Sequence, residues 1–518
     1  MPSFMKGLLE DYDKLEDIII DKGYARAWAM GFWKDDGSGK PKGLAVACVE
    51  SLVEARCHVT TQGSSQDLLL KGAILTSQGV RSHSSLLLSS GIISCVDQSC
   101  EAEPEAANAT VIECLNSVIS PGFINTHEHI DYSTVEPLAD IGERVNHRHD
   151  WRVGARGNTM RPAPVNGTSL DASIWGELRH LFSGTTSIVG GFMAPGLVRN
   201  LDYVEGLQDG LVAPASYWTV FPLDDRSGIL RNGDCDYGAQ AMTRQTVSKF
   251  NRFIAHVGEG VDAEAANEFS CISSMTYDTE PAPQGGGLST DYIAPNLAIV
   301  HGLGLTNDDF DMVAARGAKV VWSPRSNVFL YGKTLNVTYL LAAGITVALG
   351  TDWLPSGSAT MSREAVCGLE VMQESYGATL DPKTVWEMMT INAAKVAGFE
   401  DRIRSLEKGK LADIVVVGGC SNSSASYGES APYAKAILSP SENIELVIRG
   451  GKIVLASNTM KEAAEGCEKV LFGEVPKFAC VAEELGTSFA QFEASLGGAY
   501  PAILPGIPPK EPTCKPTR

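Results

Sequence analysis

Residues 118–130 of the chain read Val-Ile-Ser-Pro-Gly-Phe-Ile-Asn-Thr-His-Glu-His-Ile. The stretch turns at Pro121-Gly122, and the apolar run over 123–126 predicts a short buried strand. Because side chains two apart in a strand point to the same face, His127 and His129 are expected to converge at its carboxyl end. Two converging imidazoles suit a borderline divalent metal such as zinc, although two ordinary loop histidines would give the same pattern.

Beyond residue 120, short apolar runs alternate with helical stretches, as is typical of βα units and a parallel sheet. The runs are 123–126, 187–190, 216–221, 252–256, 298–301, 319–322 and 346–349. Nearly eight such units predict an α/β fold with a (β/α)₈ TIM barrel over residues 118–407. Barrels of this kind keep their chemistry at the carboxyl ends of the strands.

Strand signals on either side of the barrel indicate a second, smaller domain. Short strands with turns between them fill 67–117, and strands return over 408–455 with a hairpin turn at Gly450-Gly451. We expect the two parts to join as one small β-sandwich built from both ends of the chain. Residues 1–66 form an N-terminal extension with an amphipathic helix at 4–22. The tail 456–518 is expected to be part helical and loosely held at its Pro-rich end.

Composition excludes several classes of function. The 518 residues are 44% hydrophobic and 20% charged, with a net charge of −20. This charge argues against nucleic acid or an anionic membrane surface as partner, leaving a small-molecule substrate and a possible homo-oligomer. There is no long apolar run and no apolar signal core near the N-terminus, which favours a cytoplasmic location. Secretion stays open if a signal peptide has been removed.

The twelve cysteines are a normal density for a chain of this length, so reduced thiols are the default expectation. Two groups would be disulfide candidates in an oxidising compartment. Cys95, Cys100 and Cys114 cluster before the barrel, and Cys467 with Cys480 would close a short loop in the tail. The second pair is the first choice if any disulfide forms.

Polar residues end several of the predicted strands. His256 ends one strand with Glu259 three residues on, His301 ends another, and Asp352 follows a third. The turn at 323–327 ends the strand before Asp352 and carries Asn327. Taken singly, Glu259 could be a surface residue, His301 a core residue and Asp352 a helix N-cap. Because the carboxyl ends of the strands meet at one end of a barrel, their occurrence together favours a functional site.

With these motifs the chain resembles the amidohydrolase superfamily, and more narrowly its cytosine deaminase and triazine hydrolase-like branch. The resemblance covers residues 68–455 and closes on Lys-Gly-Lys-Leu-Ala-Asp-Ile-Val at 408–415. It implies a divalent metal held by four side chains, with two more around the reacting group. The implied ligands are His127, His129, His256 and Asp352, and the two further residues are Glu259 and His301.

One absence bears on the metal count. Two-metal members of this superfamily bridge their ions with a carboxylated lysine on the fourth strand. This chain has no lysine between His129 and Lys249, and the candidate fourth strand within 216–222 carries no acid. We therefore expect one metal per chain. Three His and one Asp fit zinc best, while ferrous iron and manganese also fit.

The resemblance implies a metal-dependent amidohydrolase that cleaves a non-peptide C–N bond of a small molecule. The metal lowers the pKa of a bound water to about 7. Asp352 would accept its proton, Glu259 would protonate the leaving nitrogen, and His301 would polarise the carbonyl or steady the tetrahedral intermediate. The bond is expected in an amide, a lactam or a cyclic amidine. The alternatives are deamination of a purine-, pyrimidine- or triazine-like heterocycle, hydrolysis of a halide or ester, and a non-catalytic scaffold.

Substrate contacts are the least constrained part of the sequence. The polar and aromatic loop 146–152 contains His149, which either holds substrate or belongs to a structural network. Trp353, directly after Asp352, either stacks on a planar ring or walls the pocket. Asn327 is the third candidate for contact with the substrate.

Overall fold

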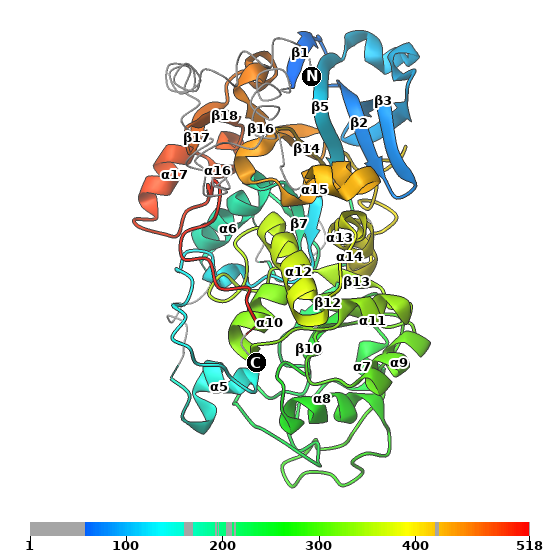
Figure 1. The fold of residues 1–518 in the computed structure, drawn as a ribbon, viewed down its shortest axis with the longest axis vertical. Coiled ribbons are helices and arrows are strands. Elements are labelled where there is room, and N and C mark those ends of the chain that lie inside the picture. The colour runs from blue at the N-terminus through cyan, green and yellow to red at the C-terminus, as the bar shows by residue number, and fades with distance from the viewer. Residues whose placement is uncertain are drawn as a thin grey trace, which may run out of the picture.

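The computed structural model describes residues 57–516, except 160–168, 192–193, 195, 204–209, 212–213 and 420–423. The helix expected over 4–22 lies outside the described residues. The described chain is an α/β fold whose strands form one ten-stranded mixed sheet and two parallel sheets of five and three strands. In Figure 1 the large sheet lies at the top, and the parallel strands with their helices lie below it.

The large sheet joins the two ends of the chain. Its order is β17-β18-β16-β15-β14-β5-β2-β3-β4, with β1 also paired to β5. The link between the chain ends is the antiparallel pair β5–β14, in which Pro121 lies opposite Ile414. The expected two-residue turn at Gly450-Gly451 joins β15 to β16, and both glycines have positive φ. The strands are β1 (His58–Thr61), β2 (Leu68–Thr76), β3 (Gly79–Ser89), β4 (Ile92–Asp97), β5 (Thr110–Pro121), β14 (Ile414–Val417), β15 (Ile444–Arg449), β16 (Lys452–Ser457), β17 (Glu468–Phe472) and β18 (Val475–Ala479).

The parallel strands run between these two parts in chain order. One sheet has the order β6-β7-β8 and the other β13-β12-β11-β10-β9. Backbone hydrogen bonds join the sheets at both edges, from Ser216 N to Leu201 O (2.8 Å) and from Asp352 N to His127 O (2.9 Å). The strands are β6 (Phe123–Asn125), β7 (Thr185–Ile188), β8 (Arg199–Asn200), β9 (Tyr217–Thr219), β10 (Phe253–Val257), β11 (Leu297–His301), β12 (Lys319–Trp322) and β13 (Val347–Leu349).

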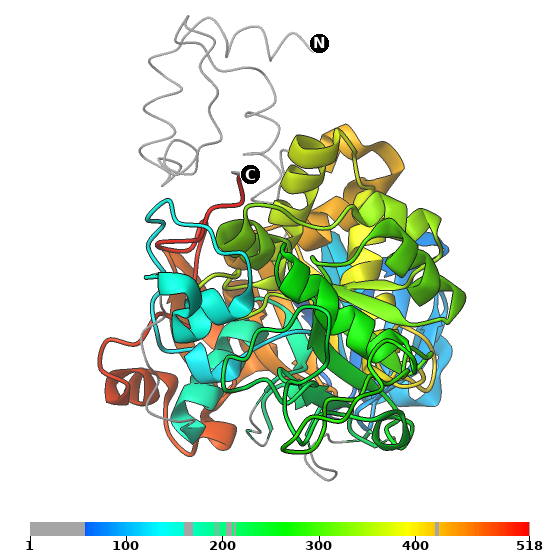
Figure 2. The same cartoon turned by 90° about the horizontal axis from the view of Figure 1, so that it is seen from below.

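Helices follow most of the parallel strands, and from below they lie around the outside of the strands (Figure 2). Alternate strand residues such as Ile254 and Val300 pack into one apolar cluster with α14, so His256, two residues after Ile254, shares its face. The helices are α5 (Arg148–Val153), α6 (Leu170–Phe182), α7 (Arg244–Val247), α8 (Ala263–Ser273), α9 (Asn307–Ala315), α10 (Pro324–Tyr331), α11 (Val337–Ala342), α12 (Met361–Tyr376), α13 (Pro382–Met389), α14 (Ile391–Ala397), α15 (Ala431–Leu438), α16 (Ala482–Leu485) and α17 (Phe489–Ser495).

The expectation of a loosely held Pro-rich end is wrong. Residues 499–516, here called the C-terminal strap, run past α6 and end beside α10 (Figure 1). The strap is fixed along its length by two carbonyls that accept from buried donors, by one backbone N–H that donates, and by the carboxylate of Glu511. The contacts are Tyr500 N to Thr134 O (3.0 Å), Trp175 Nε1 to Tyr500 O (2.7 Å), Arg363 Nε to Glu511 Oε1 (2.7 Å) and Arg325 Nη1 to Pro512 O (2.5 Å).

Five disulfides correct the expectation of reduced thiols, and the predicted pair Cys467–Cys480 is confirmed as one of them. Cys514 of the strap is bonded to Cys367 of α12, with their Cα atoms 5.6 Å apart. The other pairs are Cys57–Cys114, Cys95–Cys100 and Cys235–Cys271. Sequence alone could not predict them, because the two members of three of the five pairs lie 36 to 147 residues apart.

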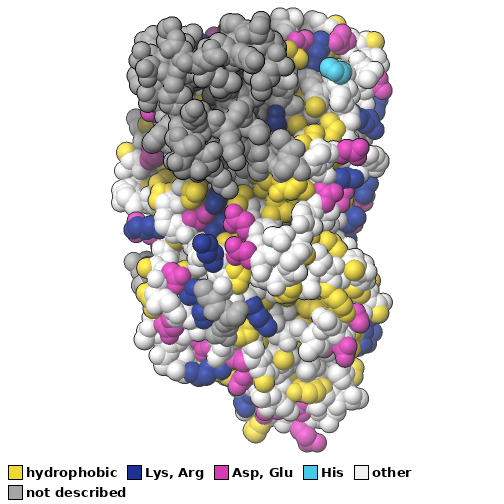
Figure 3. All heavy atoms as spheres, viewed as in Figure 1, with side chains coloured by type: hydrophobic (Ala, Val, Ile, Leu, Met, Phe, Trp, Pro, Cys, Tyr) yellow, Lys and Arg dark blue, Asp and Glu magenta, His cyan; other side chains and the backbone are white. Residues whose placement is uncertain are grey.

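On the face seen in Figure 3, acidic and basic side chains are interspersed. No helix among the described residues has the length and apolar character needed to cross a membrane.

Candidate metal centre

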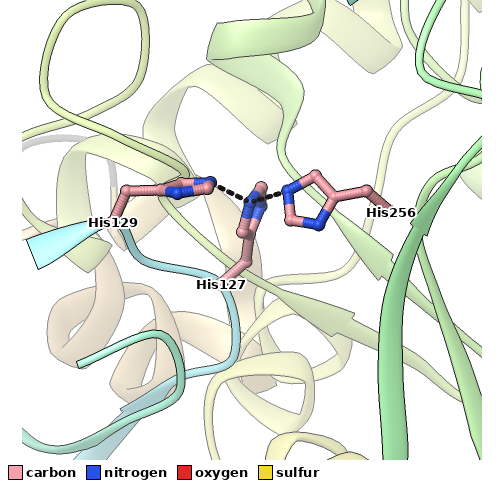
Figure 4. Close-up of side chains that lie close together, drawn as sticks. All are labelled: His127, His129 and His256. Atoms are coloured by element: carbon pink, nitrogen blue, oxygen red, sulfur yellow. Dashed lines mark hydrogen bonds between the residues drawn. The ribbon is translucent and has the colours of Figure 1, made fainter. Parts of the chain in front are cut away.

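Three histidines converge where β6 and β10 end. The Nε2 atom of His127 lies 3.2 Å from His129 Nε2 and 3.0 Å from His256 Nε2. Figure 4 shows the three rings meeting at these nitrogens from different directions. His127 and His256 are buried, while His129 keeps 18% of its side-chain surface exposed. The predicted convergence of His127 and His129 is therefore present, and β10 brings the third imidazole.

Asp352 completes this group, which we call the histidine cluster (His127, His129, His256 and Asp352). Its Oδ1 atom lies 3.2 Å from His127 Nε2 and 3.3 Å from His129 Nε2. Zinc binds imidazole nitrogen and carboxylate oxygen at about 2.0 Å, so ligand atoms around a tetrahedral zinc are roughly 3.3 Å apart. The spacing of the donor atoms in the histidine cluster therefore fits one ion of this kind.

Outer hydrogen bonds fix the orientation of the rings. The Nδ1 atom of His127 lies 2.8 Å from Ser323 Oγ, and that of His256 lies 3.3 Å from the carbonyl oxygen of Thr219. Since a carbonyl only accepts, His256 donates from Nδ1 and keeps a lone pair on Nε2. Ser326 Oγ donates to Asp352 Oδ2 at 2.6 Å. The His256 ring is thus held with the lone pair of Nε2 facing the centre, while hydrogen bonds to Ser323 and Ser326 orient His127 and Asp352.

Burial controls the charge of these groups. Burial, followed by the neighbouring imidazoles, lowers the pKa of His127 and His256 well below the usual histidine value. Burial alone would raise the pKa of Asp352, but the hydrogen bond with His129 and nearby imidazoles outweigh it and lower that pKa. Burial alone would lower the pKa of His129, but the hydrogen bond with Asp352 outweighs it and raises that pKa. His127, His256 and Asp352 therefore have the charge states that bind a metal, and His129 would lose its proton on binding.

The backbone is strained at two of the strand ends. His301 has φ of 69° and Asp352 has φ of 61°, in the left-handed region that non-glycine residues seldom adopt. Each lies at or just beyond the end of its strand. Such conformations cost about 1–3 kcal/mol and persist where the surrounding structure holds a functional side chain in place.

Glu259 and His301 face the histidine cluster from one side. Glu259 Oε2 lies 3.7 Å from His301 Nε2, which also lies 3.8 Å from Asp352 Oδ2. His301 Nδ1 lies 2.9 Å from the amide oxygen of Asn327, so this nitrogen donates. Within the described chain, His301 Nε2 is buried without a hydrogen-bond partner. Asn327 thus contacts His301, and its predicted contact with substrate stays a prediction.

Glu128, between the two histidines of the motif, was not singled out from the sequence. Its Oε2 atom accepts from Asn125 Nδ2 (2.9 Å) and Thr351 Oγ1 (2.7 Å) and lies 3.1 Å from His180 Nε2. A parallel bridge also joins Glu128 to Asp352. Glu128 therefore ties the end of β6 to the end of β13, which sets the spacing of the ligands.

His149 lies in a different group, which we call the arginine cluster (His147, Arg148, His149, Asp225 and Glu268). All five side chains are buried. Arg148 Nη2 donates to Asp225 Oδ2 (2.5 Å) and Glu268 Oε1 (2.9 Å). His149 Nε2 lies 2.9 Å from Asp225 Oδ2, and His147 Nε2 lies 3.2 Å from Glu268 Oε1. Both nitrogens of His149 face protein groups, because Arg152 Nε donates to its Nδ1 at 3.3 Å.

Trp353 is enclosed by aromatic rings. It is 3% exposed, with Tyr132 at 4.8 Å in an edge contact and Trp151 at 4.5 Å in a tilted one. Its indole nitrogen donates to Ser356. On the other side of the centre, the Trp218 ring of β9 lies 5.1 Å from His129 and 5.7 Å from His256. One aromatic ring, Trp218, therefore lies against the histidine cluster, and a second aromatic group is centred on Trp353, next to Asp352 in the chain.

Two more polar residues near the centre were missed. Ser326 bonds to Asp352 and lies in the turn from which only Asn327 was singled out. Tyr331 donates to Glu259 Oε1 at 2.7 Å. The available signal was helical spacing, because Tyr331 comes four residues after Asn327 and so shares its helix face.

The chain is similar to known hydrolases and deaminases. The model of the amidohydrolase family matches residues 243–454. A 5-methylthioadenosine/S-adenosylhomocysteine deaminase of Thermococcus onnurineus is 24% identical over 60% of this chain and 76% of its own length. An imidazolonepropionase of Geobacillus thermodenitrificans is 25% identical over 77% of this chain and 96% of its own.

Two solved structures are similar in fold. An adenosine deaminase from Xanthomonas campestris with bound zinc has a TM-score of 0.52 and 16% identity, covering 83% of this chain and 98% of its own. A variant of atrazine chlorohydrolase from Arthrobacter aurescens, complexed with zinc and atraton, has a TM-score of 0.55 and 14% identity over 83% and 100%. At these identities the likeness concerns the fold.

Proposed function

Because the chain belongs to the amidohydrolase superfamily, we propose that it is a metal-dependent hydrolase of a C–N bond other than a peptide bond. The observation that carries the proposal is the histidine cluster, in which three imidazole nitrogens and a carboxylate oxygen converge at 3.0 to 3.3 Å. Ligand atoms at this spacing can hold a divalent cation between them.

We assign His127, His129, His256 and Asp352 as ligands of one divalent metal, with zinc as the first choice. A metal bound there would supply an activated water at neutral pH. The single-metal assignment is supported by β9, the fourth parallel strand. It places the indole of Trp218 beside His129 and His256 and offers no lysine or acid that could bridge a second ion.

Asp352, Glu259 and His301 would carry out the proton transfers and the stabilisation of charge. Asp352 lies at the centre and would take up the proton that leaves the water. Glu259, three residues past the ligand His256, would carry a proton to the departing nitrogen, since an amide anion is too basic to leave. His301 Nε2 is buried and without a partner in the described chain, so it is free to bond the polar atom where charge develops.

The fold proposal follows the strand order. We propose that β6 to β13 close into a single (β/α)₈ barrel over residues 118–407. The hydrogen bonds that join the two parallel sheets at both edges support it. In the same proposal, 67–117 and 408–455 form one β domain, because β5 pairs with β14.

The substrate class is a small heterocycle. Relatives named as deaminases of adenosine derivatives and as imidazolonepropionase act on planar nitrogen rings. The Trp218 ring beside the histidine cluster suits such a ring, whose two faces are apolar. The amidine carbon of an aminated ring or the carbonyl carbon of a lactam would face the metal.

The function is tested with the zinc-loaded protein and a panel of 5′-methylthioadenosine, adenosine, a 4-imidazolone and an aminotriazine. Ammonia release and ring absorbance report turnover. Glu259→Gln should abolish hydrolysis of the best substrate while the metal content stays near that of wild type. Wild-type protein inactive on the whole panel would count against the proposal. Full turnover by Glu259→Gln would turn attention to halide and ester substrates.

The disulfides bear on the compartment. Five of them are rare in a reducing cytoplasm, so we propose that the protein works in an oxidising compartment. The two cysteines outside these pairs, Cys48 and Cys420, lie outside the described residues. Thiol titration under denaturing conditions should find at most two free thiols without reductant, and twelve after reduction. Twelve thiols before reduction would contradict this.

A further inference from the structure

The carboxylate of Glu259 accepts a hydrogen bond from Tyr331 at one of its two oxygens. Tyr331 donates to Oε1 at 2.7 Å, while Oε2 faces His301 Nε2 at 3.7 Å. Both Glu259 and Tyr331 are buried, at 2% and 0% exposure. One oxygen is therefore used by the protein, and the other is left on the side of the histidine cluster.

The direction of this hydrogen bond is fixed by a third residue. Trp151 Nε1 lies 3.1 Å from the hydroxyl oxygen of Tyr331, and an indole nitrogen can only donate. The hydroxyl oxygen therefore accepts a hydrogen bond from Trp151, and the hydroxyl group donates one to Glu259. Burial, followed by the charge of Glu259, raises the pKa of Tyr331 well above its ordinary value, so the phenol stays protonated.

The backbone of Glu259 is held by the same short helix that carries Trp151. Arg148 N donates to the carbonyl oxygen of Glu259 at 3.0 Å, and Val261 N donates to Asn146 O at 2.7 Å. An antiparallel bridge between His147 and Gly260 lies between these two bonds. Helix α5 thus fixes the main chain of Glu259 directly and its carboxylate through Tyr331.

We propose that Tyr331 and Trp151 are positioning residues that aim Glu259 at the departing nitrogen of the substrate. This inference rests on the proposed function. A hydroxyl donating to Oε1 favours the carboxylate form and leaves Oε2 on the side from which a proton can be carried to the departing nitrogen. Tyr331 keeps its own proton throughout, so it orients the transfer without joining it.

The test compares two buried tyrosines. Tyr331→Phe removes the hydroxyl that holds Glu259. Tyr292→Phe removes the hydroxyl of a tyrosine that is 2% exposed and has no hydrogen-bond partner in the described chain. Kinetics use the panel compound that wild type turns over fastest. We expect Tyr331→Phe to lower kcat about 10- to 100-fold, since a hydrogen bond to a charged group is lost. KM and zinc content should stay within about twofold, and Tyr292→Phe should match wild type.

Trp151→Phe keeps an aromatic ring but loses the indole N–H, and we expect a smaller loss of about threefold to tenfold in kcat. Crystal structures of zinc-loaded Tyr331→Phe and Tyr292→Phe give a readout that needs no substrate. The Glu259 carboxylate should rotate away from the centre only in Tyr331→Phe.

The two proposals fail in different ways. A wild-type protein that hydrolyses none of the panel would defeat the function, and the crystal structures alone would then decide the positioning role. Tyr331→Phe with an unmoved Glu259 carboxylate would overturn the positioning role. So would wild-type kcat in that variant, or an equal loss in Tyr292→Phe. In those cases the hydrolase function would stand.

Discussion

The histidine cluster and the arginine cluster are built from the same kinds of residue, yet they differ in two respects. Both bury imidazoles and carboxylates, but the histidine cluster lies at the ends of parallel strands, whereas the arginine cluster is built from α5, α8 and the loop after β9. The arginine cluster contains its own cation, because Arg148 lies between Asp225 and Glu268 and bonds both. The four residues of the histidine cluster include no arginine or lysine, and their imidazole nitrogens and the carboxylate of Asp352 face one another.

The difference teaches how to separate a structural polar core from a metal site. A guanidinium carries five N–H donors, and in the arginine cluster it compensates the charge of both acids. In the histidine cluster Asp352 accepts from Ser326 Oγ and Trp353 N, and the three imidazole Nε2 atoms face one another with no guanidinium among them. A divalent cation between these nitrogen and oxygen ligands would compensate them as Arg148 compensates its acids.

The largest effect is expected from the same substitution made in each cluster. His256→Gln should remove the bound zinc and lower turnover more than about 100-fold, because a metal ligand is lost. His149→Gln, in the arginine cluster, should keep one zinc per chain. Elemental analysis of the purified proteins measures both. Two metals per wild-type chain, or a full zinc content in His256→Gln, would contradict the assignment.

The second effect concerns stability. Arg148→Met should lower the free energy of unfolding by about 3–5 kcal/mol, because Asp225 and Glu268 would be left as unpaired buried charges. Urea unfolding measures the change. Arg226→Met is a matched control, since Arg226 is exposed and lies over the same Phe221 ring as Arg148. Its cost should stay near 0.5 kcal/mol or below. Equal costs for the two variants would remove the contrast between the clusters.

A smaller loss of stability is expected when the pH is lowered. Burial alone would raise the pKa of Asp225, but Arg148 and His149 outweigh it and lower that pKa. Since the folded pKa lies below the unfolded value of 3.8, the stabilisation is fully present above pH 5. It is lost as the pH falls through the folded pKa, by about 2 kcal/mol between pH 5 and pH 2. Unfolding free energies of metal-free wild type should fall across this window, and those of Asp225→Asn should fall less. Equal slopes would show that Asp225 is not shifted.

The strand-end residues were predictable because two local rules act together. Period-two alternation puts His127 and His129 on one face, and parallel strands bring their carboxyl ends to one side. Five of the seven predicted runs differ from the observed strands by one residue or less at each end. Run 187–190 begins and ends two residues after β7, and run 216–221 ends two residues after β9. The two-residue strand β8 was missed, since so short a strand has no periodicity to detect.

The residues that contact α5 could not be predicted from the sequence. The loop at 146–152 looked equally suited to bind substrate or to form a structural network. What separates these alternatives is that Asp225 and Glu268, 76 and 120 residues away from their partners, fold against the loop. The prediction of a loosely held strap failed for the same reason. A Pro-rich stretch is held firmly when residues distant in the sequence contact it, and these contacts cannot be seen in the sequence.

The strap also sets an order of events during synthesis. Cys514 is made 147 residues after Cys367, its disulfide partner. At about 5–20 residues per second, roughly 7–30 seconds separate the two on the ribosome. During that interval α12 has a free thiol, while Arg325 and Arg363 lack the carbonyl and the carboxylate that will hold them. A nascent chain that oxidises Cys367 too early would pair it with one of the cysteines already made. The bond between the strap and α12 can therefore form only after almost the whole chain has been made.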